Sequence, residues 1–291
     1  MISHLISICS WRALALLMLA SCSPAMAGQP PEPELRAAIQ YGLLPAQQGD
    51  IFLPSGDGRQ RRAAILVVHG GGWIGGSRTT NAGLSRFLAT EGFVVFNIDY
   101  RLAIASVPTT HWPAQLEDCE LALRWLKLHA EVLRVDPNRI GAVGDSVGGT
   151  LAVLLGVVRT GAPRSAADRP AIAAVVDQFG IMDLAALGSR AKDMNEGLFG
   201  RATAAVDQVQ SVSPIPAVTG ASAPMLIVHG TYDDFVPLRQ SQDLVTALTS
   251  HGVAAQLIAF AGGHGFAGMS GDAIAALFTQ EAAWLRHYLG S

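Results

Sequence analysis

Gly144-Asp145-Ser146-Val147-Gly148-Gly149 is the stretch of this chain that decides its fold. It follows an apolar run, Arg139-Ile140-Gly141-Ala142-Val143, and precedes a helix-forming run that starts at Thr150, an order that predicts a strand, a sharp turn and a helix. Such a turn strains the backbone of the serine, and the flanking glycines let strand and helix approach closely. Because a G-x-S-x-G sequence in this setting presents its serine above a sheet edge, Ser146 is the candidate nucleophile.

Glycine supplies 31 of the 291 residues, so the serine motif needs support from other stretches. One of them, His69-Gly70-Gly71-Gly72-Trp73, directly follows an apolar run over residues 63–68 that predicts a buried strand. Glycines let the main chain turn its N–H groups inward, where they stabilise the negative charge that acyl transfer builds on a carbonyl oxygen. We therefore interpret this loop as an oxyanion-binding element and His69 as a structural residue.

A serine nucleophile needs a base within hydrogen-bond reach, usually an imidazole that a carboxylate orients. His264 is the predicted base because it lies in a glycine-flanked loop directly after the last predicted strand. Asp233 and Asp234 both follow the strand before that one. Adjacent residues point in different directions and one carboxylate is enough, so we take Asp233 and keep Asp234 as the alternative. The chain order Ser, Asp, His is that of the α/β-hydrolases.

Predicted strands and helices alternate along the chain, which indicates an α/β fold: a mostly parallel central sheet, flanked by helices, with the chemistry at the strand carboxyl ends. Residues 180–220 show no strong period and are predicted to shape the substrate side. Residues 28–47 are predicted to be a proline-rich linker with a short helix, and residues 48–291 a single domain. The strands are expected at 51–54, 63–68, 93–98, 139–143, 172–179, 225–228 and 254–260, and the helices at 80–91, 113–129, 151–158, 238–250 and 272–289.

Composition limits the class of protein. The chain is 50% hydrophobic and 15% charged, which predicts a large buried core, and its net charge of −3 gives no electrostatic reason to expect a nucleic-acid partner. Cys119 is the one cysteine predicted to remain in the body of the protein, as a buried thiol, so neither an internal disulfide nor a zinc cluster is expected. The predicted chemistry needs no metal or organic cofactor.

Residues 1–27 carry a targeting pattern, with Arg12 before an apolar run that is too short to span a bilayer. Two cleavage patterns compete. Ala25-Met26-Ala27 is typical of ordinary secretion, whereas Leu19-Ala20-Ser21-Cys22 resembles a bacterial lipobox, which would lipidate Cys22 and anchor the protein to a membrane. Either pattern predicts export, to the periplasm, the cell exterior or the outer membrane of a bacterium.

Several stretches together resemble one family, the α/β-hydrolase esterases of the hormone-sensitive-lipase and feruloyl-esterase-like kind, over residues 48–290. The matching stretches are His69-Gly70-Gly71-Gly72-Trp73, Asp99-Tyr100-Arg101-Leu102, Glu117-Asp118, Gly144-Asp145-Ser146-Val147-Gly148-Gly149, His229-Gly230 with Asp233 and Val236-Pro237, and Gly263-His264-Gly265-Phe266. The resemblance places the orienting carboxylate on Asp233. It also implies oxyanion donors at the N–H groups of Gly71, Gly72 and Val147.

Two departures from the family pattern indicate which branch of the family the chain resembles. The segment before residue 48 is too short and proline-rich for a large helical cap, and Ala103-Ile104-Ala105 stands where the family has Ala-Pro-Glu. Both departures favour the feruloyl-esterase-like branch, with a small cap or none. The triplet Asp99-Tyr100-Arg101 lies at a predicted strand end, where we expect structural ion pairs or hydrogen bonds.

Motifs and resemblance together predict a serine carboxylesterase. Ser146 would attack the ester carbonyl, His264 would take and return the proton, and Asp233 would hold the imidazole, with an acyl-enzyme as intermediate. The expected substrate is a small or polysaccharide-linked acyl ester. Two alternatives remain: a serine peptidase of the prolyl-oligopeptidase type, which the His-Gly-Gly-Gly loop disfavours, and a non-catalytic binding protein, which the complete set of three residues disfavours.

Overall fold

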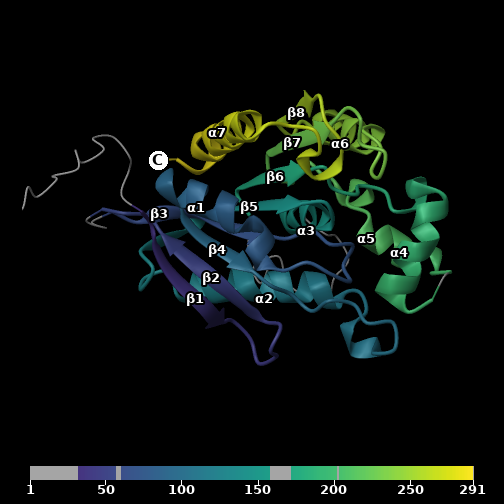
Figure 1. Ribbon diagram of the computed structural model, residues 1–291, viewed down its shortest axis with the longest axis horizontal. Helices are drawn as coiled ribbons and strands as arrows, with labels where there is room; N and C mark the ends of the chain where they lie inside the picture. Colours follow the sequence, from purple (N-terminus) through teal and green to yellow (C-terminus); the bar gives the residue numbers. More distant parts are fainter. Residues whose placement is uncertain (1–31, 57–59, 158–171, 202, 291) are drawn as a thin grey trace, which may run out of the picture. The chain divides into compact units, whose positions relative to one another are not determined.

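One mixed sheet of eight strands is the centre of the described part of the chain (Figure 1). The structure is a computed structural model and describes residues 32–56, 60–157, 172–201 and 203–290. The strand order is β1-β2-β4-β3-β5-β6-β7-β8; the β1–β2 and β2–β4 pairs are antiparallel and the other neighbours are parallel. The strands are β1 Glu34–Gln40, β2 Gln48–Leu53, β3 Arg62–Val68, β4 Val94–Ile98, β5 Val135–Asp145, β6 Ala174–Gln178, β7 Met225–Gly230 and β8 Ala255–Phe260.

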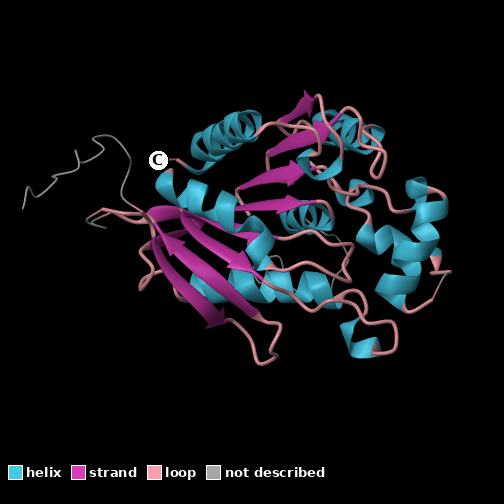
Figure 2. Ribbon diagram, in the orientation of Figure 1, coloured by secondary structure: helices cyan, strands magenta, loops and turns pink. Residues whose placement is uncertain are grey.

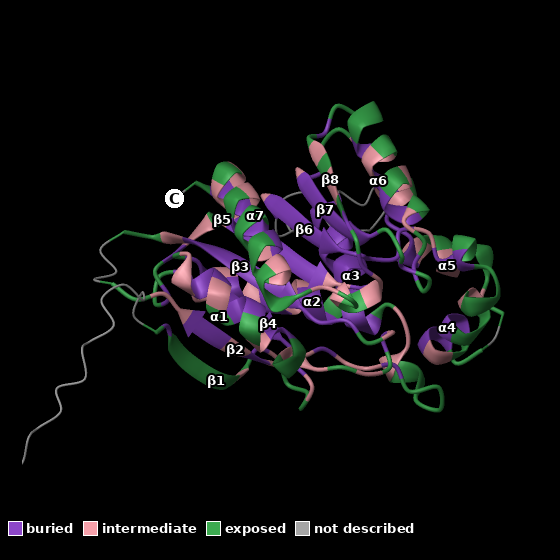
Figure 3. Ribbon diagram, turned by 45° about the horizontal axis from the view of Figure 1, so that its top comes forward, coloured by how far each residue is buried: buried purple, intermediate pink, exposed green. Residues whose placement is uncertain are grey.

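Helices cover both faces of this sheet, as Figure 2 shows. Because both faces are covered, the central strands are buried, as their purple colour in Figure 3 shows, which explains why their sequences are mostly hydrophobic. In β3, Leu66 and Val68 belong to one hydrophobic cluster and Ile65 and Val67 to the other. The first cluster lies under α2 Ala114–Leu128, α3 Val147–Gly156 and α6 Arg239–Ser250, and the second under α1 Ala82–Thr90 and α7 Gly271–Leu289.

The N-terminal part of the sheet corrects one prediction. Within the predicted linker 28–47, the short helix is wrong, because Glu34–Gln40 forms strand β1, paired antiparallel with β2 at the edge of the sheet. The strand is almost entirely exposed and contains a bulge between Arg36 and Ile39, so it lacks the apolar alternation that would predict it. Pairing with β2, rather than local sequence, makes it a strand.

The 180–220 segment forms a small cap. It contains the 3₁₀ turns η4 Ala185–Leu187 and η5 Ile215–Ala217 and the helices α4 Ser189–Phe199 and α5 Val206–Val212. Figure 1 shows α4 and α5 on the side toward which the parallel strands point, which is the side predicted to receive substrate. Leu198 and Phe199 anchor α4 in the core, so the cap packs against the domain.

The described ranges bear on membrane-spanning helices, metal clusters and the cysteine, and one predicted feature lies outside them. In residues 32–56, 60–157, 172–201 and 203–290, no helix is long and apolar enough to cross a bilayer, and no cluster of three metal-binding side chains occurs. Cys119 is a buried free thiol, and burial raises its pKa well above the ordinary value. The targeting pattern of residues 1–27, including Cys22, lies outside the described residues.

Candidate active site

The turn between β5 and α3 holds Ser146 in a strained conformation, with φ +52° and ψ −123°. Its N–H donates to the carbonyl oxygen of Gln178, 2.8 Å away. A Cβ atom on Gly144 would lie 2.2 Å from the Gly148 oxygen, and one on Gly148 would lie 2.2 Å from the Val68 oxygen, so neither position can carry a side chain. Helix α3 begins at Val147, directly after the serine and three residues before Thr150, where the helix-forming run was predicted to start.

Ser146, His264 and Asp233 form one hydrogen-bonded chain. The distance from Ser146 Oγ to His264 Nε2 is 3.0 Å, and His264 Nδ1 lies 2.7 Å from Asp233 Oδ2. Ser146 and Asp233 are 7% and 8% exposed, whereas the His264 side chain is 24% exposed, so the imidazole alone meets solvent appreciably. The three predicted residues therefore converge from loops after β5, β7 and β8.

Asp233, rather than its exposed neighbour Asp234, faces the histidine. The second oxygen of Asp233, Oδ1, accepts from the backbone N–H groups of Phe235 at 2.9 Å and Val236 at 2.8 Å. Burial alone would raise the pKa of the Asp233 carboxyl. Hydrogen bonds from His229, from His264 and from a backbone N–H outweigh burial and hold that pKa well below its usual range. Asp233 is therefore ionised.

Aromatic rings confine the His264 imidazole. The ring of Phe179 meets it edge-on at a centroid distance of 4.9 Å, and the ring of Phe235 lies tilted at 5.1 Å. The guanidinium of Arg190, on α4, lies 5.8 Å from the Phe235 centroid, which connects the cap to the site. Packing therefore fixes the imidazole between Ser146 and Asp233.

The loop after β3 has the backbone conformation that its glycines permit. Gly71 has φ +118° and Gly72 φ +63°, and a Cβ atom on Gly71 would lie 2.2 Å from the Gly75 oxygen. His69 is buried and stacks on the Tyr100 ring at 4.3 Å, and burial lowers its pKa. The structural role predicted for His69 agrees with this packing.

Asp145 ties the glycine-rich loop to the nucleophile turn, a role the sequence reading missed. Its Oδ1 accepts from the Gly70 N–H at 3.0 Å and from Asn81 Nδ2 at 2.7 Å. Gly70 lies so close to the turn that an added Cβ atom would be 3.1 Å from Ser146 Cβ. In the sequence, the position of Asp145 next to Ser146 was the one feature that could have indicated this role. Nothing in the sequence indicated its partner Asn81, which lies 64 residues earlier.

The charged residues at the end of β4, Asp99 and Arg101, form the structural ion pairs that the sequence predicted. Arg78 forms an ion pair with Asp99. Arg101 binds the fully buried Asp118 through two nitrogens, Nε at 2.9 Å to Oδ2 and Nη2 at 2.7 Å to Oδ1. The carboxylate of Asp118 also accepts from Gln47 at 2.7 Å, so both oxygens of this buried charge accept hydrogen bonds.

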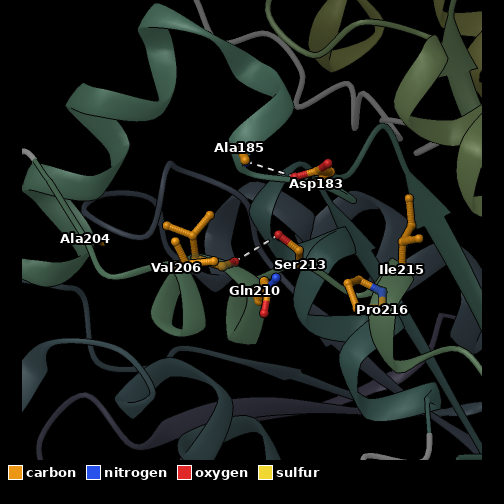
Figure 4. Close-up of a pocket in the computed structure, with 9 residues that line it drawn as sticks. Asp183, Ala185, Ala204, Val206, Gln210, Ser213, Ile215 and Pro216 are labelled. Atoms are coloured by element: carbon orange, nitrogen blue, oxygen red, sulfur yellow. Dashed lines mark hydrogen bonds between the residues drawn. The ribbon is translucent and has the colours of Figure 1, made fainter.

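Cap residues line a partly open pocket of about 340 Å³, shown in Figure 4. Its lining is mostly apolar, and Asp183 contributes a carboxylate. The backbone N–H of Asp183 donates to Gln240 on α6 at 2.6 Å, which joins the cap to the domain. The lining residues are Asp183, Ala185, Ala204, Val206, Val209, Gln210, Ser213, Ile215 and Pro216.

Fold and site together define an α/β-hydrolase, with a serine, a carboxylate and a histidine at the carboxyl ends of strands in one sheet. The chain belongs to the BD-FAE family, which it matches over residues 49–248.

Known proteins similar to this chain include esterases. It is 32% identical to esterase LipC of Mycobacterium tuberculosis over 248 residues, which is 79% of this chain and 60% of LipC. Among the solved structures that this chain resembles, two examples each have a TM-score of 0.72. One, a truncated form of a carbohydrate esterase from gut microbiota, has 25% identity and covers 87% of this chain and 97% of its own. The other is propionate-bound Est2, an esterase of Thermogutta terrifontis, with 26% identity, covering 89% of this chain and 95% of its own.

Proposed function

We propose that this chain hydrolyses carboxylic esters through an acyl-enzyme formed on Ser146. The observation that carries the proposal is the continuous hydrogen-bond chain from Ser146 Oγ through His264 to Asp233, with links of 3.0 and 2.7 Å. A serine hydroxyl becomes an effective nucleophile when a base within such reach can take its proton. Similarity to LipC and to esterases of known structure supports the same reaction.

The proposed reaction has two balanced steps. In the first, Ser146 Oγ bonds to the carbonyl carbon, His264 Nε2 takes the hydroxyl proton, and the alcohol leaves with that proton as its bond to the acyl carbon breaks. In the second, water attacks the acyl carbon, and His264 takes a proton from the water and returns it to Ser146 Oγ as the carboxylic acid leaves. Asp233, ionised throughout, stabilises the imidazolium that forms in each step.

Three backbone N–H groups are the proposed donors to the carbonyl oxygen as it gains negative charge. They belong to Gly71, Gly72 and Val147. Val147 is the first residue of α3, and the first N–H groups of a helix lack partners within it. Gly71 and Gly72 have the positive φ angles that turn a main chain in ways other residues rarely adopt. Each such donor contributes roughly 3–4 kcal/mol of transition-state stabilisation.

The proposed substrates are esters of short acyl groups with small or polysaccharide-linked alcohols. Support comes from the carbohydrate esterase and the propionate-bound esterase that this chain resembles. The exposed side chains Ile74, Tyr232 and Phe235 lie on the loops that also carry Gly72, Asp233 and their neighbours. Apolar surfaces there suit an acyl chain or the flat face of a sugar ring.

The proposal is tested with p-nitrophenyl esters of increasing acyl length, beside acetyl-xylan and methyl ferulate. Wild-type protein should hydrolyse the short esters, and Ser146→Ala should lose activity on the order of 10³-fold or more while its circular dichroism stays unchanged. A prolyl-peptide anilide run in parallel tests the peptidase alternative. Cleavage of the anilide without ester hydrolysis, or an Ala variant that keeps most of its activity, would contradict the proposal.

A further inference from the structure

A second histidine, His229, lies behind Asp233. It is on β7, is fully buried, and places its Nε2 atom 2.8 Å from the Val236 carbonyl oxygen. The same Nε2 atom lies 3.4 Å from Asp233 Oδ2, the oxygen that also contacts His264. One carboxylate oxygen therefore faces two imidazoles, and the reaction proposed above uses one of them.

Surrounding groups fix which nitrogen of His229 carries hydrogen. Both atoms beside Nε2, the Val236 carbonyl oxygen and the Asp233 carboxylate, can only accept. Nδ1 lies 2.7 Å from the hydroxyl of Ser241, a fully buried residue of α6 that can donate to it. Nε2 therefore carries the hydrogen, directed at Val236 and Asp233, and Ser241 supports this arrangement from the other side of the ring.

We propose that His229 is a positioning residue, whose Nε2–H competes with His264 for Asp233 Oδ2 and thereby sets how far into acid the enzyme remains active. The inference rests on the proposed ester hydrolysis. In this proposal the His229 imidazole joins Ser146, His264 and Asp233 as a second imidazole. It acts through the Asp233 carboxylate and does not touch substrate.

The direction of the effect follows from the sharing of charge. A carboxylate oxygen that accepts two N–H groups interacts less strongly with each than an oxygen that accepts one. Without the Nε2–H of His229, Asp233 Oδ2 would interact more strongly with His264 and favour its protonated form, which cannot act as a base. Oδ1 would still accept from Phe235 and Val236, so the carboxylate keeps its orientation.

One further titratable group faces His229. Asp177, on the adjacent strand β6, is fully buried; burial raises its pKa to about 7, and its attraction to His229 opposes that rise. The other polar neighbours are Ser241 from α6 and Asp233 and the Val236 carbonyl from the loop after β7. Because Asp177 titrates inside the range of the assay, its contribution is removed separately with Asp177→Asn.

Two amide substitutions separate the two ring nitrogens of His229. The side-chain amide nitrogen of glutamine can occupy the place of Nε2 and donate to Asp233. The side-chain amide of asparagine is shorter, so it can reach Ser241 but cannot reach Asp233. His229→Asn and His229→Gln are compared with wild type and with His251→Gln, an exposed histidine at the end of α6. The readout is kcat/KM for p-nitrophenyl acetate between about pH 4.5 and 9, scaled by active-site titration with a fluorophosphonate.

The acid limb of kcat/KM should move to higher pH by ~0.5–1 unit in His229→Asn, and should stay at the wild-type position in His229→Gln and His251→Gln. The same displacement between Asn and Gln should persist in an Asp177→Asn background. If the acid limbs of His229→Asn and His229→Gln coincide, and activity falls only in proportion to the fraction of active enzyme, the proposal is overturned and His229 is a structural residue. A wild-type enzyme without ester hydrolysis would instead overturn the proposed function.

Discussion

Glu281 should make the stability of the protein fall as pH rises, and Glu281→Gln should remove that fall. The residue lies on α7, is fully buried, and both its oxygens accept from Gln178 Nε2, at 2.8 and 2.9 Å. Burial raises the pKa of its carboxyl to about 8, although the hydrogen bond from Gln178 opposes this rise. Because the Gln178 carbonyl oxygen also accepts from Ser146, this carboxyl lies one residue from the site.

The sign follows from proton binding. Between about pH 4.5 and 8 the unfolded chain has released the Glu281 proton and the folded chain retains it, so the folded state binds more protons and the free energy of unfolding falls with rising pH. The slope approaches about 1.4 kcal/mol per pH unit, and over this window it accumulates to roughly 4 kcal/mol. Asp177, whose pKa is raised to about 7 by burial, adds a fall of the same sign below pH 7.

The assay is urea unfolding followed by tryptophan fluorescence at pH 5, 6, 7 and 8. Wild type should lose stability steadily across the series. Glu281→Gln should lose distinctly less and should exceed wild type at pH 8, because an amide has no proton to release. Asp272→Asn, which removes an exposed carboxylate from the same helix, should follow wild type. Parallel wild-type and Glu281→Gln profiles would refute the reasoning, since the buried carboxyl would then titrate as it does in the unfolded chain.

Three further predictions concern the site and the leader. Asp233→Asn should lower kcat on the order of 10⁴-fold and Asp234→Asn far less, measured with p-nitrophenyl acetate; the reverse order would show that the wrong neighbour was chosen. Asp145→Ala should lower kcat about 10²-fold with a smaller change in KM, because the Gly70 N–H loses its acceptor and the oxyanion loop loses its position; an unchanged kcat would contradict this. We also propose export, by one of the two cleavage patterns: if the lipobox is used, mass spectrometry should find an acylated Cys22 terminus and Cys22→Ala should release the enzyme from membranes or shift cleavage to after Ala27, whereas an unmodified Gly28 terminus would exclude anchoring.

Most of the fold could be predicted because its strands are buried on both faces. In β3, residues 63–68 are all buried and all apolar, and that continuous run is visible without knowledge of its neighbours. β1 could not be predicted for the opposite reason. It lies at the sheet edge, is exposed almost throughout, and exists because β2 supplies its hydrogen-bond partners.

The turn at Ser146 and the glycine-rich loop after β3 are largely local features, which the amino-acid sequence predicts. Ser146 must lie at a strained corner between strand and helix, and backbone carbonyl groups 2.2 Å from added Cβ atoms exclude side chains at Gly144 and Gly148. For Gly144 the excluding carbonyl is that of Gly148, and for Gly71 it is that of Gly75, so these two constraints act within four residues and are visible in the chain. The carbonyl that excludes a side chain at Gly148 belongs to Val68 on β3, so that constraint comes from the tertiary structure.

The choice between Asp233 and Asp234, and the contacts of His229 and Asp145, required the tertiary structure. Two adjacent carboxylates are equivalent in the sequence, and only the packing of the loop after β7 buries one against His264 and exposes the other. The hydrogen bonds of Asp145 join segments 64 and 75 residues apart. No local pattern encodes such contacts, because the direction of a side chain in a loop depends on which neighbouring strands and helices leave room for it.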